Sequence, residues 1–248
     1  MKIEGSVALV TGANRHNGIG RAIVEALLRA GVKKIYATGR DIKPLAELAS
    51  EHPDVVFPLS LDITDTKQIN AAAAQAGDVN LLINNAGIAL FAGLVAEKDL
   101  TAARTEMEVN YFGTLAMIRA FAPVLKTNGG GAIVNIASIA SIVNFPVLGS
   151  YSASKAAEHS MTQGVRAELA GQGTRVIGIF PGPVETDMAK NFDMEKVTPS
   201  QISVAVLAAI AEGNEDVFPD DMAAEVYANF MNDPKAVEKE LSEMLPTT

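Results

Sequence analysis

The first forty residues predict a strand, a glycine turn, a helix and a second strand, and this order constrains the fold more than any other feature. Residues 7–10 form a short apolar run that ends at a turn containing Gly12. Apolar residues in 20–30 recur three and four positions apart, as in an amphipathic helix, and residues 33–38 form another apolar run. Because parallel strands need a crossover connection, usually a helix, this order predicts a parallel sheet.

The same alternation continues along the chain. Further strands are predicted at 55–61, 79–84, 132–137 and 175–180, and further helices at 44–50, 65–76, 101–126 and 151–170, with Thr64 capping the helix at 65–76. Leu81, Leu82 and Ile83 are consecutive, as expected for a strand covered on both faces. We therefore expect one α/β domain over residues 1–248, with a doubly wound parallel sheet flanked by helices on both faces.

Composition excludes several classes of protein. The net charge of −9 and the lack of a Lys/Arg block argue against binding to nucleic acid or anionic membranes. Cysteine is absent, which excludes disulfides and thiolate catalysis, and the three scattered histidines do not suggest a metal site. We expect neither a signal peptide nor a membrane-spanning helix, because no apolar run approaches about 18 residues. A cytoplasmic location is the resulting expectation.

Polar or turn-forming residues stand where four of the predicted strands end. Asp62, Asn84, Ser138 and Pro181 each close or directly follow an apolar run. In doubly wound sheets, ligands bind beyond the carboxyl ends of the strands. We therefore expect these four segments to meet in one crevice.

Tyr151 and Lys155 are four residues apart, and if Tyr151 opens a helix they share a face, with Cβ atoms about 5 to 6 Å apart. A free phenol has a pKa of about 10 and is a poor acid–base group near neutrality. A nearby ammonium favours phenolate, so we expect Lys155 to lower the pKa of Tyr151. Ser138 would supply a second hydrogen bond to a carbonyl oxygen. The three residues predict a proton-transfer site.

The glycine turn predicts a site for a dinucleotide. Gly12, Gly18 and Gly20 allow a tight turn and let the backbone approach a pyrophosphate at a helix amino terminus. Asn14 and Ile19 belong to the same loop. Three glycines in a loop also occur in ordinary turns, so the inference depends on the strand and helix that flank it.

The end of the second predicted strand favours NADP(H) over NAD(H). An acid after this strand would bind the two ribose hydroxyls of NAD, whereas a cation favours a 2′-phosphate. Thr38 and Gly39 stand where the acid would be expected, and Arg40 follows. Arg15 in the glycine loop is a second candidate for the same phosphate. The alternative is that Asp41 points inward and Arg40 is only a surface charge.

Five ordered motifs make the whole chain resemble the short-chain dehydrogenase/reductase family. They are the glycine turn, the sequence Asn84-Asn85-Ala86-Gly87, Ser138, Tyr151 with Lys155, and Pro181-Gly182. The resemblance implies a Rossmann-type fold, a nicotinamide cofactor and a reversible conversion of carbonyl to alcohol.

The resemblance also implies roles for individual residues. Tyr151 would be the general acid in reduction and the base in oxidation, Ser138 would hold the substrate oxygen, and Lys155 would act on Tyr151 and bind the nicotinamide ribose. Asn110 matches a helix-interrupting asparagine that is thought to hold a relay water. The further residues expected at the cofactor are Asp62 and Ile63 at the adenine, Asn84, Ala86 and Gly87 along the adenosine ribose, and Pro181, Gly182, Val184 and Thr186 at the nicotinamide.

The glycine turn departs from the family pattern, because five residues instead of three separate Gly12 from Gly18. We place the two additional residues at His16 and Asn17, where they would lengthen the loop. This insertion puts the role of Arg15 and the choice of cofactor in question.

Two segments are expected to line the substrate space, residues 139–148 and 186–197, and they are rich in apolar side chains. These are Ile142, Val143, Phe145, Val147, Leu148, Met188, Phe192 and Met194. They favour a hydrophobic ketone, aldehyde or secondary alcohol, although the same side chains could simply pack beneath a loop.

Two other functions are compatible with these motifs. One is reduction of 3-oxoacyl groups on an acidic carrier protein, although the acidic carboxyl-terminal half lacks a basic docking patch. The other is an NADP(H)-sensing protein without turnover. The long apolar helices at 101–126 and 151–170 also lead us to expect a homo-oligomer, either a dimer or a tetramer.

Overall fold

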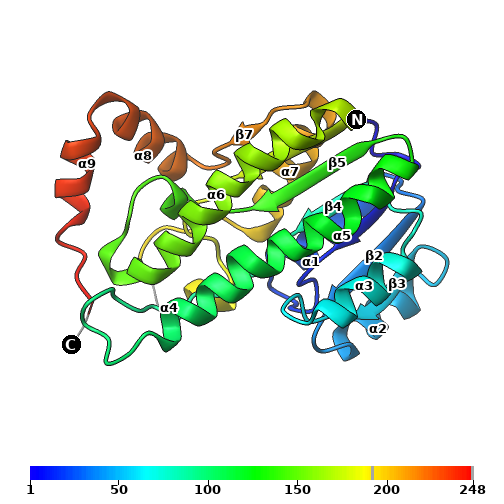
Figure 1. Cartoon of the computed structure of the whole chain (residues 1–248), viewed down its shortest axis with the longest axis horizontal. Coiled ribbons are helices and arrows are strands. Elements are labelled where there is room, and N and C mark those ends of the chain that lie inside the picture. Colours follow the sequence, from blue (N-terminus) through cyan, green and yellow to red (C-terminus); the bar gives the residue numbers. More distant parts are fainter. Residues whose placement is uncertain (191–192, 247–248) are drawn as a thin grey trace.

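The protein folds around one seven-stranded parallel sheet, seen in a computed structural model that describes residues 1–190 and 193–246 (Figure 1). The strand order is β3-β2-β1-β4-β5-β6-β7, which is the Rossmann order with one additional strand. The strands are β1 Val7–Val10, β2 Lys34–Gly39, β3 Val56–Ser60, β4 Leu81–Asn84, β5 Gly131–Ile136, β6 Thr174–Ile179 and β7 Asp216–Val217. The predicted doubly wound parallel sheet is confirmed.

Helices connect successive strands and continue beyond β7. They are α1 Ile19–Arg29, α2 Lys43–Glu51, α3 Thr66–Gln75, α4 Thr101–Glu106, α5 Thr114–Thr127, α6 Gly149–Leu169, α7 Pro199–Glu212, α8 Asp221–Asn232 and α9 Pro234–Leu241. A π-helical segment, Met107–Gly113, joins α4 to α5, and short 3₁₀ turns lie at Ile139–Ser141, Pro146–Leu148, Ala170–Gln172 and Asp187–Ala189.

The strands supply apolar side chains to both faces of the sheet. Ala8 and Val10 of β1 join the core beneath α1, α2 and α7, whereas Val7 and Leu9 join the core beneath α3, α5 and α6. This alternation follows from the two-residue period of a strand. It explains why the strands are continuous apolar runs, because both faces are covered.

The structure corrects three boundaries predicted from the sequence. The expected helix at 101–126 contains the π-helical segment Met107–Gly113, and the helix bearing Tyr151 begins earlier, at Gly149. Asp65, and not Thr64, caps α3, because its carboxylate accepts from the backbone N–H groups of Lys67 and Gln68. The sequence interpretation also assigned no elements after residue 180 and so missed α7, β7, α8 and α9.

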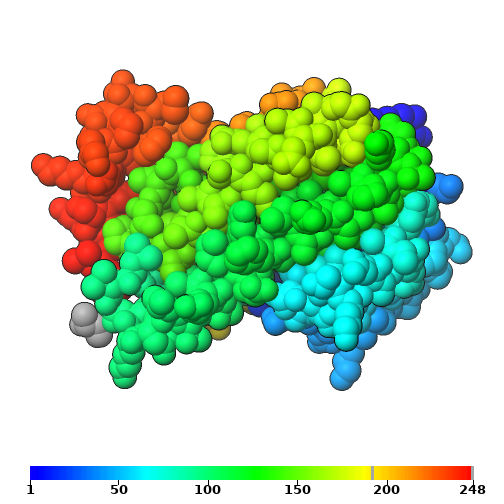
Figure 2. All heavy atoms as spheres, viewed as in Figure 1, coloured from blue at the N-terminus to red at the C-terminus, as the bar shows by residue number. Residues whose placement is uncertain are grey.

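The last two helices form a small lobe beyond the carboxyl ends of the strands. Figure 1 shows α8 and α9 apart from the sheet, and Figure 2 shows the same lobe as the orange-to-red mass at the left. Val237 and Leu241 of α9 pack with Ala223 of α8 against Val143 and Phe145 from the segment that follows β5. The lobe therefore lies next to the edge at which ligands are expected.

Among residues 1–190 and 193–246, no helix is both long enough and apolar enough to span a membrane. The longest, α6, has 21 residues, and it carries Lys155, Glu158, Arg166 and Glu168 along its length.

Candidate active site

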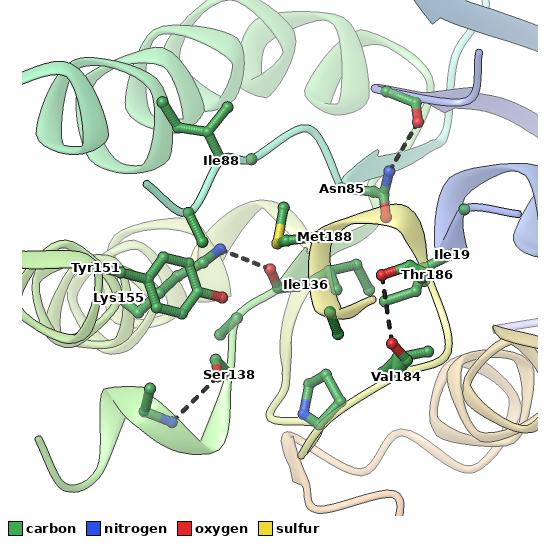
Figure 3. A pocket seen from close by; sticks show the side chains of 18 of the residues that line it. Ile19, Asn85, Ile88, Ile136, Ser138, Tyr151, Lys155, Val184, Thr186 and Met188 are labelled. Carbon is green, nitrogen blue, oxygen red and sulfur yellow. Dashed lines mark hydrogen bonds between the residues drawn. The ribbon is translucent and has the colours of Figure 1, made fainter. Parts of the chain in front are cut away.

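The predicted functional segments meet in one pocket at the carboxyl ends of the strands (Figure 3). Most of the residues singled out in the sequence line it. They are Gly12, Asn14, Arg15, Gly18, Ile19, Arg40, Asp62, Ile63, Ala86, Gly87, Ser138, Tyr151, Lys155, Pro181, Gly182, Val184 and Thr186. Gly20, Asn84 and Asn110 are not among the lining residues.

Tyr151, Ser138 and Lys155 come together at one end of this pocket. Figure 3 shows the Tyr151 hydroxyl in the same part of the pocket as the Ser138 side chain and the Lys155 ammonium. The Lys155 Nζ atom lies 5.9 Å from the centre of the Tyr151 ring. Ser138 ends the strand segment as the cap of a 3₁₀ turn, and its Oγ accepts from the Ala140 N–H at 3.1 Å. This bond fixes the direction of the serine side chain.

The pKa of Tyr151 depends on more groups than Lys155. Burial raises the pKa of Tyr151 above its ordinary value, although Lys155 and the hydrogen bond with Ser138 both lower it. Glu158 and Glu106 also raise this pKa. Lys155 thus lowers the pKa of Tyr151 as expected, but burial and the two carboxylates outweigh it, so this pKa lies above its ordinary value.

Lys155 is held by two partners in the interior. Its Nζ atom donates to the Ile136 carbonyl at 3.0 Å and forms an ion pair with Glu158 Oε2 at 2.6 Å. Glu158 was not recognised from the sequence. Its position three residues after Lys155 on a helix is the available signal, because residues so spaced are neighbours.

Asn110 occupies the middle of the π-helical segment and is fully buried. Its Oδ1 accepts from the Ile88 N–H, and its Nδ2 donates to the Ile88 carbonyl and to Ser154 Oγ, each at 2.9 Å. The side chain therefore ties the loop after β4 to α6. π-helical turns often occur at functional sites, and this one breaks the helix where the family resemblance placed an interruption.

The glycine turn places the amino terminus of α1 at the pocket. Gly18 is the N-cap of α1, and no side chain caps this end, so the first N–H groups remain available for an anion. Gly20 has a different role. A Cβ on Gly20 would lie 2.4 Å from Asn85 Nδ2 and 2.7 Å from the Gly12 carbonyl oxygen, so this glycine allows close packing behind the turn.

The two additional residues of the turn lie outside the pocket. His16 and Asn17 are exposed, and the Gly18 N–H closes the turn by donating to the Arg15 carbonyl at 3.0 Å. Arg15 and Gly18 consequently both remain in the pocket lining. The two additional residues therefore face solvent, while Arg15 and Gly18 face the pocket.

Two guanidinium groups stand at this end of the pocket. Arg15 and Arg40 are both exposed, and neither forms an ion pair with any residue in the described part of the chain. Asp41 is exposed and accepts from the Lys43 N–H, which contradicts the alternative that it points inward. The unpaired cations and the uncapped helix end fit a dinucleotide that carries phosphate groups.

Asp62 and Ile63 line the pocket after β3, and one carboxylate oxygen of Asp62 accepts from the N–H and hydroxyl of Thr64. Asn84 does not line the pocket, contrary to the expectation that it lies along the adenosine ribose. Its side chain is buried and donates to Asn135 Oδ1 at 2.9 Å, because the last residue of β4 pairs with its neighbour in β5. The next residue, Asn85, lines the pocket instead.

Asn85 and Thr11 tie the ends of β1 and β4 together, and neither was predicted as a site residue. Thr11 Oγ1 accepts from the N–H groups of Asn85 and Ala86 at 2.9 and 3.0 Å. Asn85 Nδ2 donates to the Thr11 carbonyl at 2.8 Å. The signal in the sequence was a polar residue at the end of each adjacent strand.

The segment after β6 is anchored to the carboxyl-terminal lobe. The Gly182 N–H donates to Asp220 Oδ2 at 2.8 Å, while Asp220 Oδ1 accepts from the Ala223 N–H at 2.9 Å and caps α8. Thr186 Oγ1 donates to the Val184 carbonyl at 3.3 Å. One carboxylate therefore joins the pocket loop to α8, a contact that the sequence interpretation missed.

The substrate side of the pocket is apolar, but its lining only partly matches the expectation. Phe145, Val147, Leu148, Met188 and Met194 line it as predicted. Ile142 and Val143 instead pack into the carboxyl-terminal lobe, and Phe192 lies outside the described residues. The lining residues that were not predicted include Phe91, Met222 and Met244.

Metal chemistry was not expected from the sequence. In residues 1–190 and 193–246, no three histidine, aspartate or glutamate side chains are grouped so that they could hold a metal ion.

Comparison with known proteins gives a consistent assignment. Residues 6–196 match the short chain dehydrogenase family. An uncharacterised oxidoreductase from Staphylococcus saprophyticus is 36% identical over 86% of this chain and 94% of its own length. A galactitol 2-dehydrogenase from Cereibacter sphaeroides is 38% identical over 75% of this chain and 74% of its own length.

A solved structure extends the agreement to nearly the whole chain. A short chain dehydrogenase from Burkholderia cenocepacia J2315 is 46% identical and superimposes with a TM-score of 0.92, covering 97% of this chain and 99% of that one. The strand order, the pocket and these relatives agree. The chain therefore belongs to the short-chain dehydrogenase/reductase family, whose members are oxidoreductases acting on alcohol and carbonyl groups.

Proposed function

We propose that this protein is an NADP(H)-dependent carbonyl reductase that converts hydrophobic ketones or aldehydes to alcohols and catalyses the reverse oxidation. The observation that carries the proposal is the composition of one pocket. It combines Ser138, Tyr151 and Lys155 with two unpaired guanidinium groups and an apolar wall rich in methionine.

The preference for NADP(H) is supported by charge. Arg15 and Arg40 are the cations that would bind a 2′-phosphate, and no acid from the end of β2 lines the pocket. The Burkholderia cenocepacia relative was solved in complex with NADP. When bound, the nicotinamide group donates or accepts hydride.

The residues of the chain would manage the proton and the substrate oxygen. In reduction, Tyr151 would give its phenolic proton to the carbonyl oxygen, while the Ser138 hydroxyl donates a hydrogen bond to that oxygen. In oxidation, the same two side chains would act in reverse. Lys155 would favour transfer of the proton by placing a positive charge near the developing phenolate.

The substrate class follows from the apolar wall. Met188, Met194, Met222 and Met244 approach from three separate segments, and the flexible thioether side chain adapts to irregular apolar shapes. Asp221, Glu225, Glu238 and Glu243 give the nearby lobe an acidic character, which disfavours docking of an acidic acyl carrier.

The proposal includes a homo-oligomer, either a dimer or a tetramer. Exposed apolar side chains beside the long helices support it, namely Leu94, Val95, Leu100 and Phe112. Light scattering coupled to size-exclusion chromatography would measure the assembly, and a monomer at micromolar concentration would contradict it.

The test of function is consumption of NADPH, and separately of NADH, with a panel of hydrophobic ketones and aldehydes. Tyr151→Phe should lower turnover by about 10²- to 10⁴-fold, because it removes the proton donor. Tyr227→Phe is the matched control, since Tyr227 stacks on Phe218 and does not line the pocket. Full activity of Tyr151→Phe would contradict the assigned acid. Binding of NADPH without consumption would instead favour a sensor.

A further inference from the structure

A buried carboxylate lies against the proposed catalytic lysine. Glu158 is 1% exposed and Lys155 is 4% exposed. Their side chains meet at 2.6 Å between Glu158 Oε2 and Lys155 Nζ, three residues apart on α6. Lys155 is the one side chain with which the Glu158 carboxylate pairs among the described residues.

The pairing limits what the ammonium can do. A lysine ammonium has three N–H donors and no acceptor. One donor goes to Glu158 and a second to the Ile136 carbonyl at 3.0 Å, which fixes the nitrogen from two directions. One donor therefore remains for the pocket, so the lysine is presented in a single defined position.

The charges around the site also favour a special role for Glu158. The charged groups that act on Tyr151 are Lys155 and Glu158 on α6 and Glu106 on α4, and those that act on Lys155 are Glu158 and Tyr151. Burial lowers the pKa of Lys155, whereas Glu158 and Tyr151 raise it, and the pKa lies above its ordinary value. Burial raises the pKa of Glu158, and the adjacent ammonium of Lys155 opposes this rise by favouring the carboxylate. Glu158 also raises the pKa of Tyr151.

Packing alone does not require a carboxylate at this position. Met161 and Val165 lie on the same buried face of α6. A buried ion pair can often be replaced by apolar residues of similar volume without loss of stability. The glutamate is therefore better explained by its effect on Lys155 than by the folding of α6.

We propose that Glu158 is a positioning residue of the active site, whose carboxylate fixes the Lys155 side chain and offsets its charge so that Tyr151 remains a protonated donor. This inference rests on the roles proposed above for Tyr151 and Lys155. In this role Glu158 influences proton transfer through Lys155 and Tyr151 and does not contact the substrate.

The test uses Glu158→Gln, which keeps the shape of the side chain and removes its charge. Glu168→Gln is the matched control, because Glu168 lies on the same helix but is exposed. The chain has four tyrosines, so ¹³Cζ-tyrosine labelling and NMR can measure the chemical shift of each phenol as a function of pH. The signal that is missing from the spectrum of Tyr151→Phe belongs to Tyr151. This readout needs no cofactor or substrate.

The direction of the expected shift follows from the charges. Loss of an anion favours the deprotonated form of both neighbours, so Tyr151 and Lys155 should each release a proton at lower pH in Glu158→Gln. We expect the titration of Tyr151 to move down by about one pH unit or more. In a kinetic profile, reduction should fall off at correspondingly lower pH, because it needs a protonated tyrosine and a charged lysine. Glu168→Gln should match the wild type.

An unchanged Tyr151 titration in a folded Glu158→Gln protein would overturn the inference, even if its stability or turnover falls. If Glu158→Gln does not fold, Glu158→Asp offers the same test, because its shorter side chain draws the carboxylate away from Lys155. A smaller shift in the same direction is expected there, and no shift would overturn the inference. A fully active Tyr151→Phe would instead contradict the proposed function, whatever the titrations show.

Discussion

At the scale of single residues, the pocket carries charge in two separate places. Arg15 and Arg40 stand unpaired among the described residues at the glycine turn, whereas Lys155 is buried and paired with Glu158. Because the two arginines are solvated and the Lys155–Glu158 pair is buried, the two sets of charges have different functions. Exposed, unpaired guanidinium groups can take up a phosphate, and a buried pair can set the protonation of a neighbour.

Arg40→Ala tests the first of these uses. Loss of a charge-assisted hydrogen bond to the 2′-phosphate should weaken NADPH binding about tenfold or more, and NADH binding should not change, because NADH lacks that phosphate. Calorimetric titration with both cofactors measures the effect. Arg29→Ala is the control, since Arg29 is an exposed arginine at the far end of α1. An equal loss for NADH and NADPH would show that Arg40 does not discriminate between them.

At the scale of elements, the amino end of α1 depends on the absence of a side chain. Gly20→Ala would place a methyl group 2.4 Å from Asn85 Nδ2, so we expect a loss of about 1 to 3 kcal/mol in the free energy of unfolding, together with weaker cofactor binding. Gly164→Ala in α6 has open space and should gain about 0.5 to 1 kcal/mol. Denaturant titration compares the two variants, and a Gly20→Ala protein as stable as wild type would contradict the packing argument.

Asp220 caps α8 and also binds the pocket segment after β6 at Gly182. A second capping aspartate allows the effects of these two contacts to be measured separately. Asp220→Ala and Asp233→Ala each remove the side-chain cap of a helix and should each cost about 1 kcal/mol in the free energy of unfolding. Only Asp220 also accepts from the Gly182 N–H in the pocket. We therefore expect Asp220→Ala alone to weaken NADPH binding, which fluorescence titration can measure. Equal binding by the two variants would mean that the link has no effect on the site.

At the scale of the whole molecule, the pocket is assembled from distant parts of the chain. Gly12 and Arg15 come from the first turn, Tyr151 from α6, and Met244 from the residues after α9. The carboxyl-terminal lobe packs against the segment that follows Ser138. The fold of this lobe therefore determines the shape of the substrate side.

Met244→Ala should widen that side of the pocket. Under the proposed function, the ratio of kcat/KM for bulky over small ketones should rise about tenfold or more, because contacts of this size discriminate substrates by that amount. Met231→Ala is the control, since Met231 is 65% exposed on α8 and does not line the pocket. An unchanged ratio would place the bound substrate elsewhere.

Much of the fold and of the candidate site was predictable from the sequence. The strand ends, the glycine turn and the Tyr151 and Lys155 pair were recognised because each depends on neighbours along the chain. Asn84 was misassigned because it still belongs to β4, where its side chain lies beside that of its partner Asn135 on β5. Met222 and Met244 were missed because they reach the pocket only after α8 and α9 pack against the segment following β5.

The sequence by itself determined the parallel sheet and the set of residues at its carboxyl edge, because periodicity and turn chemistry are local properties. The tertiary structure alone decided the charge balance around Tyr151. Burial, Glu106 on α4 and Glu158 on α6 act on that phenol together with Lys155, and their combined effect raises its pKa above its ordinary value. The physical reason is that electrostatic interactions depend on distance and solvation in the folded molecule, and these two quantities are not encoded in the spacing of residues along the chain.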